Sequence, residues 1–373
     1  MNPPKEASPK KVSLTYSLAD QSFARTKSIG ILNVSLDFLR VLAQRPECDH
    51  LTVLANPTLS DAILPTSGMT IQLHDRAAGG GLSRIWWDQF GAYTAARRAG
   101  HEWLFLPKGF ASFARRCPVR LATLIHDLMQ DHYDRHYPDF VSGWEAAYFR
   151  AALRASMRQS DIIFTPTESV RREIEHVIRE KGWPLPRLVC CGEGFTRPAA
   201  LQTAERRDLM VLAGRFPHKL TRRAVEFLSR WRSQNNFAEQ THWVGSFPEN
   251  LELPQHPDWR QHKRLPEDEF RAMMARARVV LFFSDYEGFG RPPVEATLAG
   301  ACPVYSDIPA TREVMEGRGC PFNNDSYKSF AAALNRGLSV GPEQLQVWAE
   351  ELSVLHDWNS VAGRVLNAIL EAT

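Results

Sequence analysis

The sequence has little of what would tie it to nucleic acid, a membrane span or a disulfide framework. Its 45 Lys and Arg against 42 Asp and Glu leave a net charge of only +3, so we expect neither nucleic acid nor a strongly acidic partner. No hydrophobic run reaches the length of a transmembrane helix, and the polar, proline-rich start is unlike a secretion signal. The six cysteines are scattered and include no Cys-x-x-Cys pair. These shortages predict a reduced, cytoplasmic protein with buried thiols and a flexible tail at residues 1–11.

Strand-like and helix-like segments alternate over residues 12–190. Residues 31–43 carry hydrophobic side chains at helical spacing, and the candidate strands are 12–16, 51–54, 70–73, 103–106, 121–125 and 162–165. This alternation predicts a parallel sheet with helices on both faces. Because 373 residues exceed one ordinary core, we expect this region to be the first of two domains.

A proline-rich passage over residues 184–198 predicts the hinge between the domains. The alternation then starts again, with candidate strands at 208–213, 241–245, 279–283 and 302–305. We therefore expect a second domain over residues 205–355, followed by an amphipathic helix within residues 356–373. The predicted fold class is α/β, with two Rossmann-like, doubly wound domains that face each other across a cleft.

The most informative segment spans residues 284–296 and reads Ser-Asp-Tyr-Glu-Gly-Phe-Gly-Arg-Pro-Pro-Val-Glu-Ala. It follows a candidate buried strand and leads into a helix expected at residues 293–299, with proline in its first turn. Glu287 and Glu295 stand eight positions apart on either side of the glycine turn. A strand end, a glycine turn and a helix N-terminus direct backbone N–H groups toward space where phosphate or sugar oxygens bind. The alternative is a solvated loop carboxylate and a glutamate that only complements the helix dipole.

This segment resembles the Glu-x7-Glu motif of the family 4 retaining glycosyltransferases, which use nucleotide sugars and have the GT-B fold. The likeness continues over residues 299–314, which read Ala-Gly-Ala-Cys-Pro-Val-Tyr-Ser-Asp-Ile-Pro-Ala-Thr-Arg-Glu-Val. It covers residues 205–370 closely and the first half of the chain more loosely. The resemblance also implies that the first domain, residues 12–190, binds the acceptor and that the second, residues 205–355, binds the nucleotide-sugar donor. The final helix, residues 356–373, would cross back onto the first domain.

The resemblance implies a role for the residues of the segment. Glu295 would bind the ribose of the donor, and Glu287 would bind hydroxyl groups of the transferred sugar. The backbone N–H groups of the turn would hold the same sugar; they belong to Gly288, Phe289, Gly290 and Arg291.

Two cations and a histidine complete the predicted site. Arg215 and Lys219 follow the candidate strand at 208–213 and match family positions that bind the diphosphate, on which negative charge grows as the sugar departs. His126 follows the strand at 121–125 and matches the family's His-Asp pair, whose histidine contacts the sugar. Gly30 is what remains of the family's phosphate-binding turn near the first helix. A solvated basic loop and a structural histidine are the alternatives.

We predict no metal and no other cofactor, because the nucleotide sugar would be a substrate. The sequence contains no Asp-x-Asp. Asp131, His132, Asp134 and His136 imitate a metal cluster, but we expect them in a loop without a defined order of ligands. Arg215, Lys219 and helix dipoles would stabilise the leaving group instead.

Basic residues concentrate between residues 82 and 120, where seven Lys or Arg stand against two acidic residues, 7 − 2 = +5. Trp86 and Trp87 lie in this stretch, and three further arginines follow at four-residue spacing between residues 150 and 158. One interpretation is a surface that attracts a phosphate-bearing acceptor, or makes a weak peripheral contact with the inner face of the cell membrane. The favoured alternative is a set of ordinary solvated faces around a core tryptophan.

Residues and resemblance together predict a retaining glycosyltransferase that moves a hexose from a nucleoside diphosphate sugar to a hydroxyl of a glycan or lipid-linked acceptor. Family members with the run at residues 306–314 often build cell-surface polysaccharide, which favours a mannose-type donor. Two alternatives stay open. A GT-B nucleotide-sugar epimerase would need no acceptor, and a catalytically silent nucleotide-sugar-binding subunit would not hydrolyse the donor.

Overall fold

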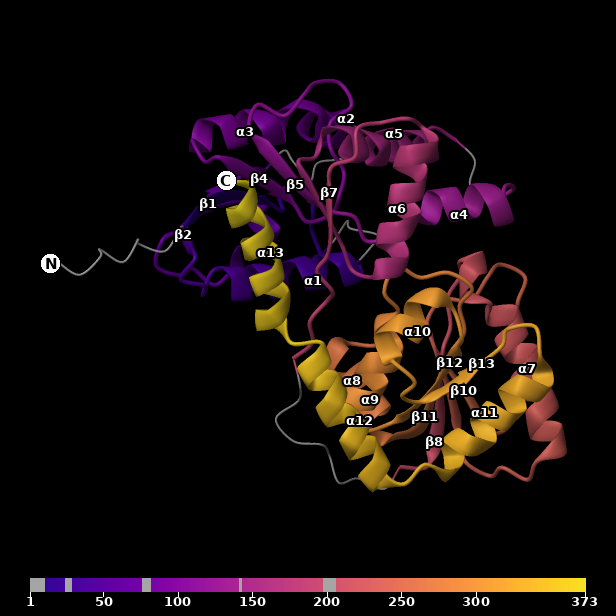
Figure 1. Ribbon diagram of the computed structural model, residues 1–373. Helices are drawn as coiled ribbons and strands as arrows, with labels where there is room; N and C mark the ends of the chain where they lie inside the picture. The colour runs from indigo at the N-terminus through magenta and orange to yellow at the C-terminus, as the bar shows by residue number, and fades with distance from the viewer. Residues whose placement is uncertain (1–10, 24–28, 76–81, 141–142, 197–205) are drawn as a thin grey trace, which may run out of the picture. The chain divides into compact units, whose positions relative to one another are not determined.

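The computed structural model describes residues 11–23, 29–75, 82–140, 143–196 and 206–373. These residues form two compact units, each built on a parallel sheet (Figure 1). The first unit takes residues 1–131, 142–194 and 358–373, and the second takes residues 132–141 and 195–357. Most of the tail expected at residues 1–11 lies outside the described residues, as does the end of the expected hinge.

The first unit contains a seven-stranded sheet in the order β3-β2-β1-β4-β5-β6-β7, in which all neighbouring strands are parallel. The strands are β1 (Val12–Ser17), β2 (Cys48–Ala55), β3 (Met69–Leu73), β4 (Trp103–Leu106), β5 (Arg120–Leu124), β6 (Ile162–Thr165) and β7 (Arg187–Cys190). The helices of this half of the chain are α1 (Ile29–Leu42), η1 (Pro57–Ala62), α2 (Leu82–Trp86), the π-helix η2 (Trp87–Gly91), α3 (Ala92–Ala99), α4 (Met129–His136), α5 (Trp144–Gln159) and α6 (Glu168–Glu180).

Alternating side chains of the strands build a separate core on each face of this sheet. Trp103 and Phe105 of β4 pack on one face with α1 and with the last helix, α13 (Trp358–Ala372). Leu104 and Leu106 of the same strand point to the other face, where they meet α3. Both faces are therefore buried, which explains why these strands read as continuous hydrophobic runs.

The second unit contains a six-stranded parallel sheet in the order β10-β9-β8-β11-β12-β13. The strands are β8 (Asp208–Leu212), β9 (Thr241–Val244), β10 (Trp259–His262), β11 (Ala277–Phe282), β12 (Cys302–Ser306) and β13 (Cys320–Phe322). The helices are η3 (Pro217–Lys219), α7 (Thr221–Gln234), α8 (Glu267–Arg276), α9 (Arg291–Leu298), α10 (Pro309–Met315), α11 (Tyr327–Ser339) and α12 (Pro342–Leu355).

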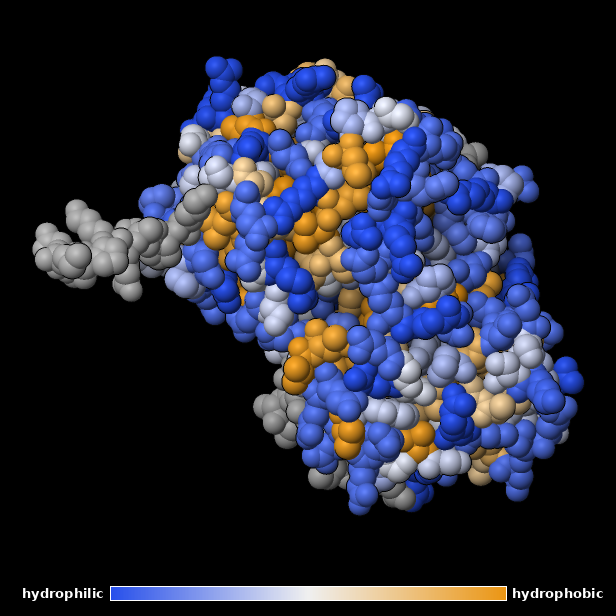
Figure 2. Space-filling model, viewed as in Figure 1, coloured by the Kyte–Doolittle hydropathy of each residue, from blue (hydrophilic) through white to orange (hydrophobic). Residues whose placement is uncertain are grey.

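The second sheet is buried on both faces in the same way. Val279 and Leu281 of β11 pack with α7 and α11, whereas Val280 and Phe282 pack on the face of α8, α9 and α12. On the side drawn in Figure 2, the hydrophobic residues that reach the surface form scattered patches among hydrophilic ones. Most large hydrophobic side chains are thus used inside the two cores.

The predicted α/β class with two doubly wound, Rossmann-like sheets is confirmed. Three differences concern single elements. The passage expected as a hinge contains β7, the loop expected around His132 is the helix α4, and the strands β10 and β13 were not predicted. The final helix α13 packs within the first unit, where Trp103 Nε1 donates to Thr373 Oγ1 at 3.1 Å.

Candidate functional site

In each sheet the strand order reverses at one point, between β1 and β4 in the first unit and between β8 and β11 in the second. Loops that leave the strand ends at such a point diverge and leave room for a ligand. In the second unit, Lys219 follows β8 and Glu287 follows β11. Their side chains form an ion pair between Lys219 Nζ and Glu287 Oε1, so two residues predicted for the site meet at the switch point of the second sheet.

A glycine lets Lys219 reach this position. The turn η3 folds the chain back after β8, and a Cβ atom at Gly214 would lie 2.6 Å from Cγ of Lys219. Thr221 holds the turn, because its Oγ1 accepts from Gly214 N at 3.0 Å and donates to Gly214 O at 2.7 Å. The ammonium group of Lys219 also lies 5.2 Å from the centre of the Phe282 ring. The Lys219 side chain is therefore fixed by its surroundings and not freely solvated.

The turn that carries Glu287 is anchored by buried polar groups. Ser284 N donates to Ser306 Oγ at 2.9 Å, and Asn324 Nδ2 donates to Ser284 O at 2.8 Å. Ser306 Oγ in turn donates to Asn324 Oδ1 at 2.6 Å. The carbonyl oxygen of His218 accepts from Asp285 N at 2.9 Å, which ties this turn to the one that carries Lys219.

Gly290 and Arg291 shape the helix start that follows. Gly290 has φ +86° as the N-cap of α9, a conformation that favours glycine, and a Cβ atom there would meet Thr311 Cγ2 at 2.9 Å. The helix begins at Arg291, two residues earlier than expected, so Glu295 lies in its second turn. Arg291 Nε donates to Glu295 Oε1 at 3.1 Å. The Phe289 side chain is buried in the core, which leaves only its backbone for a ligand.

Arg215 has a different environment from Lys219. Its side chain is exposed, and its guanidinium lies 5.0 Å from the centre of the neighbouring Phe216 ring. Within the part of the chain that the structure describes, no hydrogen bond or ion pair of Arg215 is seen. Arg215 is thus available to an anionic ligand, whereas Lys219 is paired with Glu287.

Residues 132–141 bring four contacts to this site that the sequence did not reveal. His132 Nε2 lies 3.1 Å from Asp285 Oδ1, and Tyr137 donates to the other oxygen of the same carboxylate. The His132 ring stacks on Tyr286, with centroids 4.5 Å apart. Tyr133 Oη lies 2.5 Å from Nδ1 of the buried His218. We name residues 132–141 the α4 arm, because this segment belongs by its contacts to the second unit although the chain around it belongs to the first.

The α4 arm explains the histidines that imitate a metal cluster. His132 and His136 lie on the helix α4 rather than in a loop, and His132 is hydrogen-bonded to Asp285. Among the described residues, no three His, Cys, Asp or Glu side chains come close enough together to hold a metal ion. Burial lowers the pKa of His218 to about 2, helped by the charges of Lys219 and His132. His218 is therefore a neutral part of the packing at neutral pH.

In the first unit, His126 follows β5 and is buried. Its Nε2 lies 2.8 Å from the carbonyl oxygen of Pro107, and its Nδ1 lies 3.3 Å from Glu193 Oε1. Carbonyl and carboxylate oxygens only accept, so a ring bonded to both carries two protons when Glu193 is ionised. Burial disfavours this charged form, but the hydrogen bond and charge of Glu193 outweigh burial and raise the pKa of His126. Glu193 gave no signal in the sequence.

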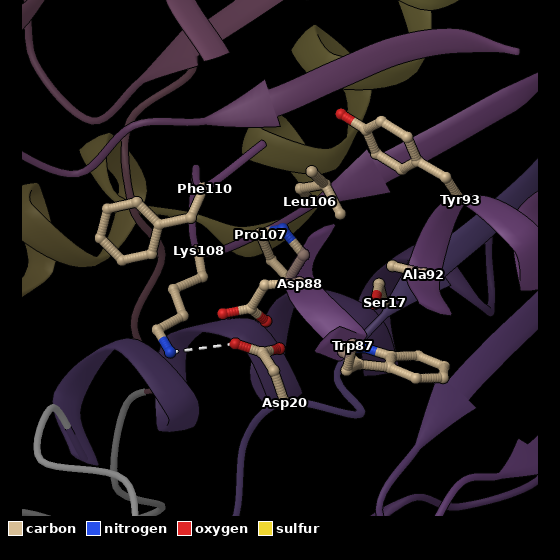
Figure 3. Close-up of a pocket in the computed structure, with 10 residues that line it drawn as sticks. All are labelled: Ser17, Asp20, Trp87, Asp88, Ala92, Tyr93, Leu106, Pro107, Lys108 and Phe110. Carbon is tan, nitrogen blue, oxygen red and sulfur yellow. Dashed lines mark hydrogen bonds and ion pairs between the residues drawn. The ribbon is translucent and has the colours of Figure 1, made fainter. Parts of the chain in front are cut away.

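A small pocket lies at the switch point of the first sheet, and it is lined by Pro107, whose carbonyl oxygen contacts His126. Asp20 follows β1, Lys108 follows β4, and Lys108 Nζ contacts Asp20 Oδ2 at 3.0 Å. The carboxylate of Asp88 faces that of Asp20 in the same pocket, which Pro107 also lines (Figure 3). Burial, and next the charge of Asp20, raise the pKa of Asp88 to about 6. The pocket measures about 20 Å³, enough for one water molecule or one hydroxyl group.

Of the other features predicted for the first unit, Trp87 lines this pocket, whereas Gly30 and Trp86 do not. Gly30 is exposed in the first turn of α1, and its place says nothing of a ligand. In the basic stretch, Trp87 is buried but Trp86 is 59 % exposed, so only one of the two is a core tryptophan. Arg97 and Arg98 are exposed at the end of α3. In the described part of the chain, no helix is long and hydrophobic enough to cross a bilayer.

Sequence comparisons point to one family. Residues 207–339 match the family described as "Glycosyl transferases group 1". An O-antigen chain mannosyltransferase of Salmonella typhimurium is 23% identical over an alignment of 206 residues, and the alignment covers 53% of this chain and 56% of that protein. A GDP-mannose:cellobiosyl-diphosphopolyprenol alpha-mannosyltransferase of Xanthomonas oryzae is 31% identical over 112 residues, 28% of this chain and 29% of the relative. The chain thus matches little more than half the length of the first of these curated relatives and less than a third of the second.

Solved structures show the same fold over nearly the whole chain. Sucrose-phosphate synthase from Thermosynechococcus elongatus aligns with a TM-score of 0.65 at 13% identity, over 97% of this chain and 100% of that one. The Anabaena protein HepE, solved in complex with UDP and glucose, aligns with a TM-score of 0.63 at 14% identity, over 96% and 100%. The family match contains β8, β11, Lys219 and Glu287, so it covers the site described above. Residues 207–339, within the second unit, are therefore similar to the group 1 glycosyltransferases, and the chain as a whole has the GT-B fold.

Proposed function

We propose that the protein transfers a hexose from a nucleoside diphosphate sugar to a hydroxyl group, with retention of the anomeric configuration. The observation that carries this proposal is the meeting of Lys219 and Glu287 at the switch point of the second sheet, directly before the helix that holds Glu295. A cation, a carboxylate and a helix start in one place supply the groups that a diphosphate and a sugar need.

Each residue takes one part in the proposed reaction. Lys219 and Arg215 bind the diphosphate, which gains negative charge as the bond to the sugar breaks. Glu287 accepts hydrogen bonds from the sugar, Glu295 binds the ribose, and His126 contacts the sugar. The backbone of Gly288 to Arg291 donates to sugar oxygens, and Gly30 faces the diphosphate from the head of α1. Without a ligand, these side chains neutralise one another in the ion pairs Lys219–Glu287 and Arg291–Glu295. The ligand would replace these ion pairs when it binds.

The relatives favour a mannose-type donor and a polysaccharide product. One is named an O-antigen chain mannosyltransferase, and the name of another gives GDP-mannose as donor and a diphosphopolyprenol-linked sugar as acceptor. We extend both features to this chain as a proposal: a mannosyl-type donor and a glycan or lipid-linked acceptor in cell-surface polysaccharide synthesis. A weak contact of the exposed arginines of α3 with an anionic membrane belongs to the same proposal.

A panel of nucleoside diphosphate sugars and glycan acceptors tests the proposed function. The purified protein should consume one donor, release its nucleoside diphosphate and add one hexose to the acceptor, as seen by mass spectrometry. Nuclear magnetic resonance of the product should show the anomeric configuration of the donor. Conversion of the donor without any acceptor would instead support an epimerase, and a donor that binds but is never consumed would support a silent binding subunit.

The same assay in EDTA tests whether the proposed reaction proceeds without a metal ion. Transfer should continue at an undiminished rate, because side chains and backbone dipoles neutralise the leaving group. Complete loss of transfer in EDTA, with recovery on addition of magnesium or manganese, would contradict this part of the proposal.

A further inference from the structure

The pocket at the switch point of the first sheet has polar atoms that the roles proposed above do not use. Lys108 Nζ contacts one oxygen of Asp20 at 3.0 Å (Figure 3). Tyr148 Oη donates to one oxygen of Asp88 at 2.8 Å. Among the described residues, the second oxygen of each carboxylate has no hydrogen-bond partner. The side chains of Asp20 and Asp88 keep 15% and 11% of their surface exposed, so both remain accessible from the solvent.

A π-helical turn places Asp88 in this pocket. Residues 82–99 form one helical run of α2, η2 and α3, in which the π-helix η2 lets Ala92 N donate to Trp87 O. A Cβ atom at Gly91 would lie 2.5 Å from the Trp87 ring, so a larger residue there would displace the indole. Turns of this kind are rare and often occur at functional sites. This turn sets the positions of Trp87 and Asp88, which both line the pocket.

The pocket offers both donors and acceptors of hydrogen bonds. Lys108 carries three N–H bonds, of which its described hydrogen bond uses one, whereas the two carboxylates only accept. A hydroxyl group can accept from Lys108 and donate to Asp20 or Asp88. With all three side chains ionised the formal charge is 1 − 2 = −1, which disfavours a phosphate. One uncharged hydroxyl group therefore fits both the chemistry of the pocket and its volume of about 20 Å³.

Four charged or titratable side chains of the described residues surround Asp88. Asp20 and Lys108 line the same pocket. Arg84 Nε lies 3.8 Å from Asp88 Oδ2 on the same helical run, and Tyr148 reaches that oxygen from α5. Burial, and next the charge of Asp20, raise the pKa of Asp88 to about 6, while Lys108 and Arg84 oppose this shift. Asp88 is therefore ionised at neutral pH and protonated in mild acid.

We propose that this pocket binds one uncharged hydroxyl group of the acceptor, held between the carboxylates of Asp20 and Asp88 and the ammonium group of Lys108. This inference rests on the proposed function, because the acceptor is the second substrate of that reaction. Asp88 then selects acceptor sugars that carry a hydroxyl at one position, and any phosphate of the acceptor stays outside the pocket. The ionised form of Asp88 accepts a stronger hydrogen bond than an amide in its place.

Titration with methyl glycosides tests the pocket without depending on turnover. The probes are the methyl α-glycosides of mannose, glucose and galactose, followed by ligand-observed nuclear magnetic resonance. At neutral pH at least one glycoside should bind, and its Kd should rise about tenfold as the pH falls through about 6, because Asp88 becomes protonated. In Asp88→Asn the Kd should have the higher value at neutral pH and should not change over the same range.

Matched variants separate recognition from folding. Asp61→Asn makes the same change at an exposed residue of η1 in the first unit, and it should keep the wild-type Kd and its pH dependence. Lys108→Gln removes the donor to the same hydroxyl and should also raise the Kd about tenfold, which provides a second variant if thermal unfolding shows that Asp88→Asn is not folded. Equal Kd values and pH profiles in wild type and Asp88→Asn, or no binding of any of the three glycosides, would overturn the proposal.

Deoxygenated acceptors distinguish this proposal from the proposed function. In wild type, removal of the hydroxyl that enters the pocket should raise the KM of the acceptor about tenfold. In Asp88→Asn the same removal should have no further effect, because both changes delete one interaction, and the KM of the donor should stay constant. Equal effects of every deoxygenation in both proteins would contradict a hydroxyl site at Asp88. If the wild-type protein consumed no donor, the proposed function would fail, and the titration above would still decide whether the pocket binds a sugar hydroxyl.

Discussion

Glu287 and Glu295 occupy different environments, and this difference separates their expected roles. Glu287 is paired with Lys219, whereas Glu295 is paired with Arg291 one turn earlier on α9. Glu287→Ala should lower kcat about a hundredfold, because sugar contacts that strengthen in the transition state are lost. It should leave affinity for the bare nucleoside diphosphate unchanged or higher, since Lys219 is released for the diphosphate.

Glu295→Ala should do the reverse and mainly raise the KM of the donor, through lost ribose contacts. Steady-state kinetics and nucleotide titration of both variants check the pair, with Glu267→Ala on the exposed start of α8 as the control. If Glu287→Ala abolished nucleotide binding while Glu295→Ala left it intact, the two assignments would be inverted.

Arg215 offers a charge that no described partner neutralises. Arg215→Ala should slow transfer about a hundredfold, because a fixed donor to a developing anion contributes about 3 kcal/mol. The free energy of unfolding should hardly change, since the side chain is exposed. Arg271→Ala, on the surface of α8, is the matched control. A rate unchanged in Arg215→Ala would exclude this arginine from the reaction.

Two buried histidines, His218 and His126, should contribute to the free energy of unfolding with opposite dependence on pH. The folded pKa of His218 is lowered to about 2, so its contribution to stability is present above its ordinary pKa and is lost as the pH falls below it. The folded pKa of His126 is raised, so its contribution is present at low pH and is lost as the pH rises through the folded value. Urea unfolding across pH should show less acid destabilisation in His218→Gln and less alkaline destabilisation in His126→Gln. Unaltered pH profiles in both variants would contradict this account.

At the scale of elements, the α4 arm makes contacts with the candidate site that could not be predicted from the sequence. Tyr137 and His132 hold the carboxylate of Asp285, two residues before Glu287, and Tyr133 bonds His218 next to Lys219. These partners stand about 85 to 153 positions apart in the chain, and no spacing rule joins them. The arm therefore supports both turns of the candidate site from one side.

Removal of these bonds should loosen the turn that carries Glu287. His132→Ala combined with Tyr137→Phe should lower kcat about tenfold and destabilise the protein by about 2 kcal/mol, the range for hydrogen bonds to a charged group. Nucleotide affinity should change little, because neither side chain is assigned to the nucleotide. Arg135→Ala changes an exposed residue of the same helix and serves as the control. Wild-type kcat in the double variant would show that the arm has no role in positioning.

The elements that could be predicted from the sequence are those whose burial produces a simple pattern of hydrophobic residues along the chain. Strands buried on both faces, such as β4 and β11, read directly as hydrophobic runs. The edge strand β10 buries only Trp259, and β13 has three residues including a proline, so neither produces such a run. The strand β7 was hidden within a proline-rich passage. In the site, the motif around Glu287 was readable because its residues are contiguous, whereas Glu193 and Asn324 act through distant partners.

At the scale of the whole molecule, a nucleoside diphosphate should stabilise the folded protein. The proposed site joins the turns after β8 and β11, which exist together only in the folded second unit. At a hundredfold excess over Kd, the gain is about 2.7 kcal/mol. A thermal scan with millimolar guanosine or uridine diphosphate checks this, with the free nucleoside as the control. No shift of Tm with either nucleotide would count against the site.

Nucleotide release and sugar transfer, measured together, test the central claim most directly. In the presence of the consumed donor and an acceptor, wild-type protein should produce nucleoside diphosphate and glycosylated acceptor in equal amounts. The variant Lys219→Met, which lacks the ion pair to Glu287, should produce both about a hundredfold more slowly. Equal rates in wild type and Lys219→Met, or nucleotide release without any glycosylated product, would contradict the account.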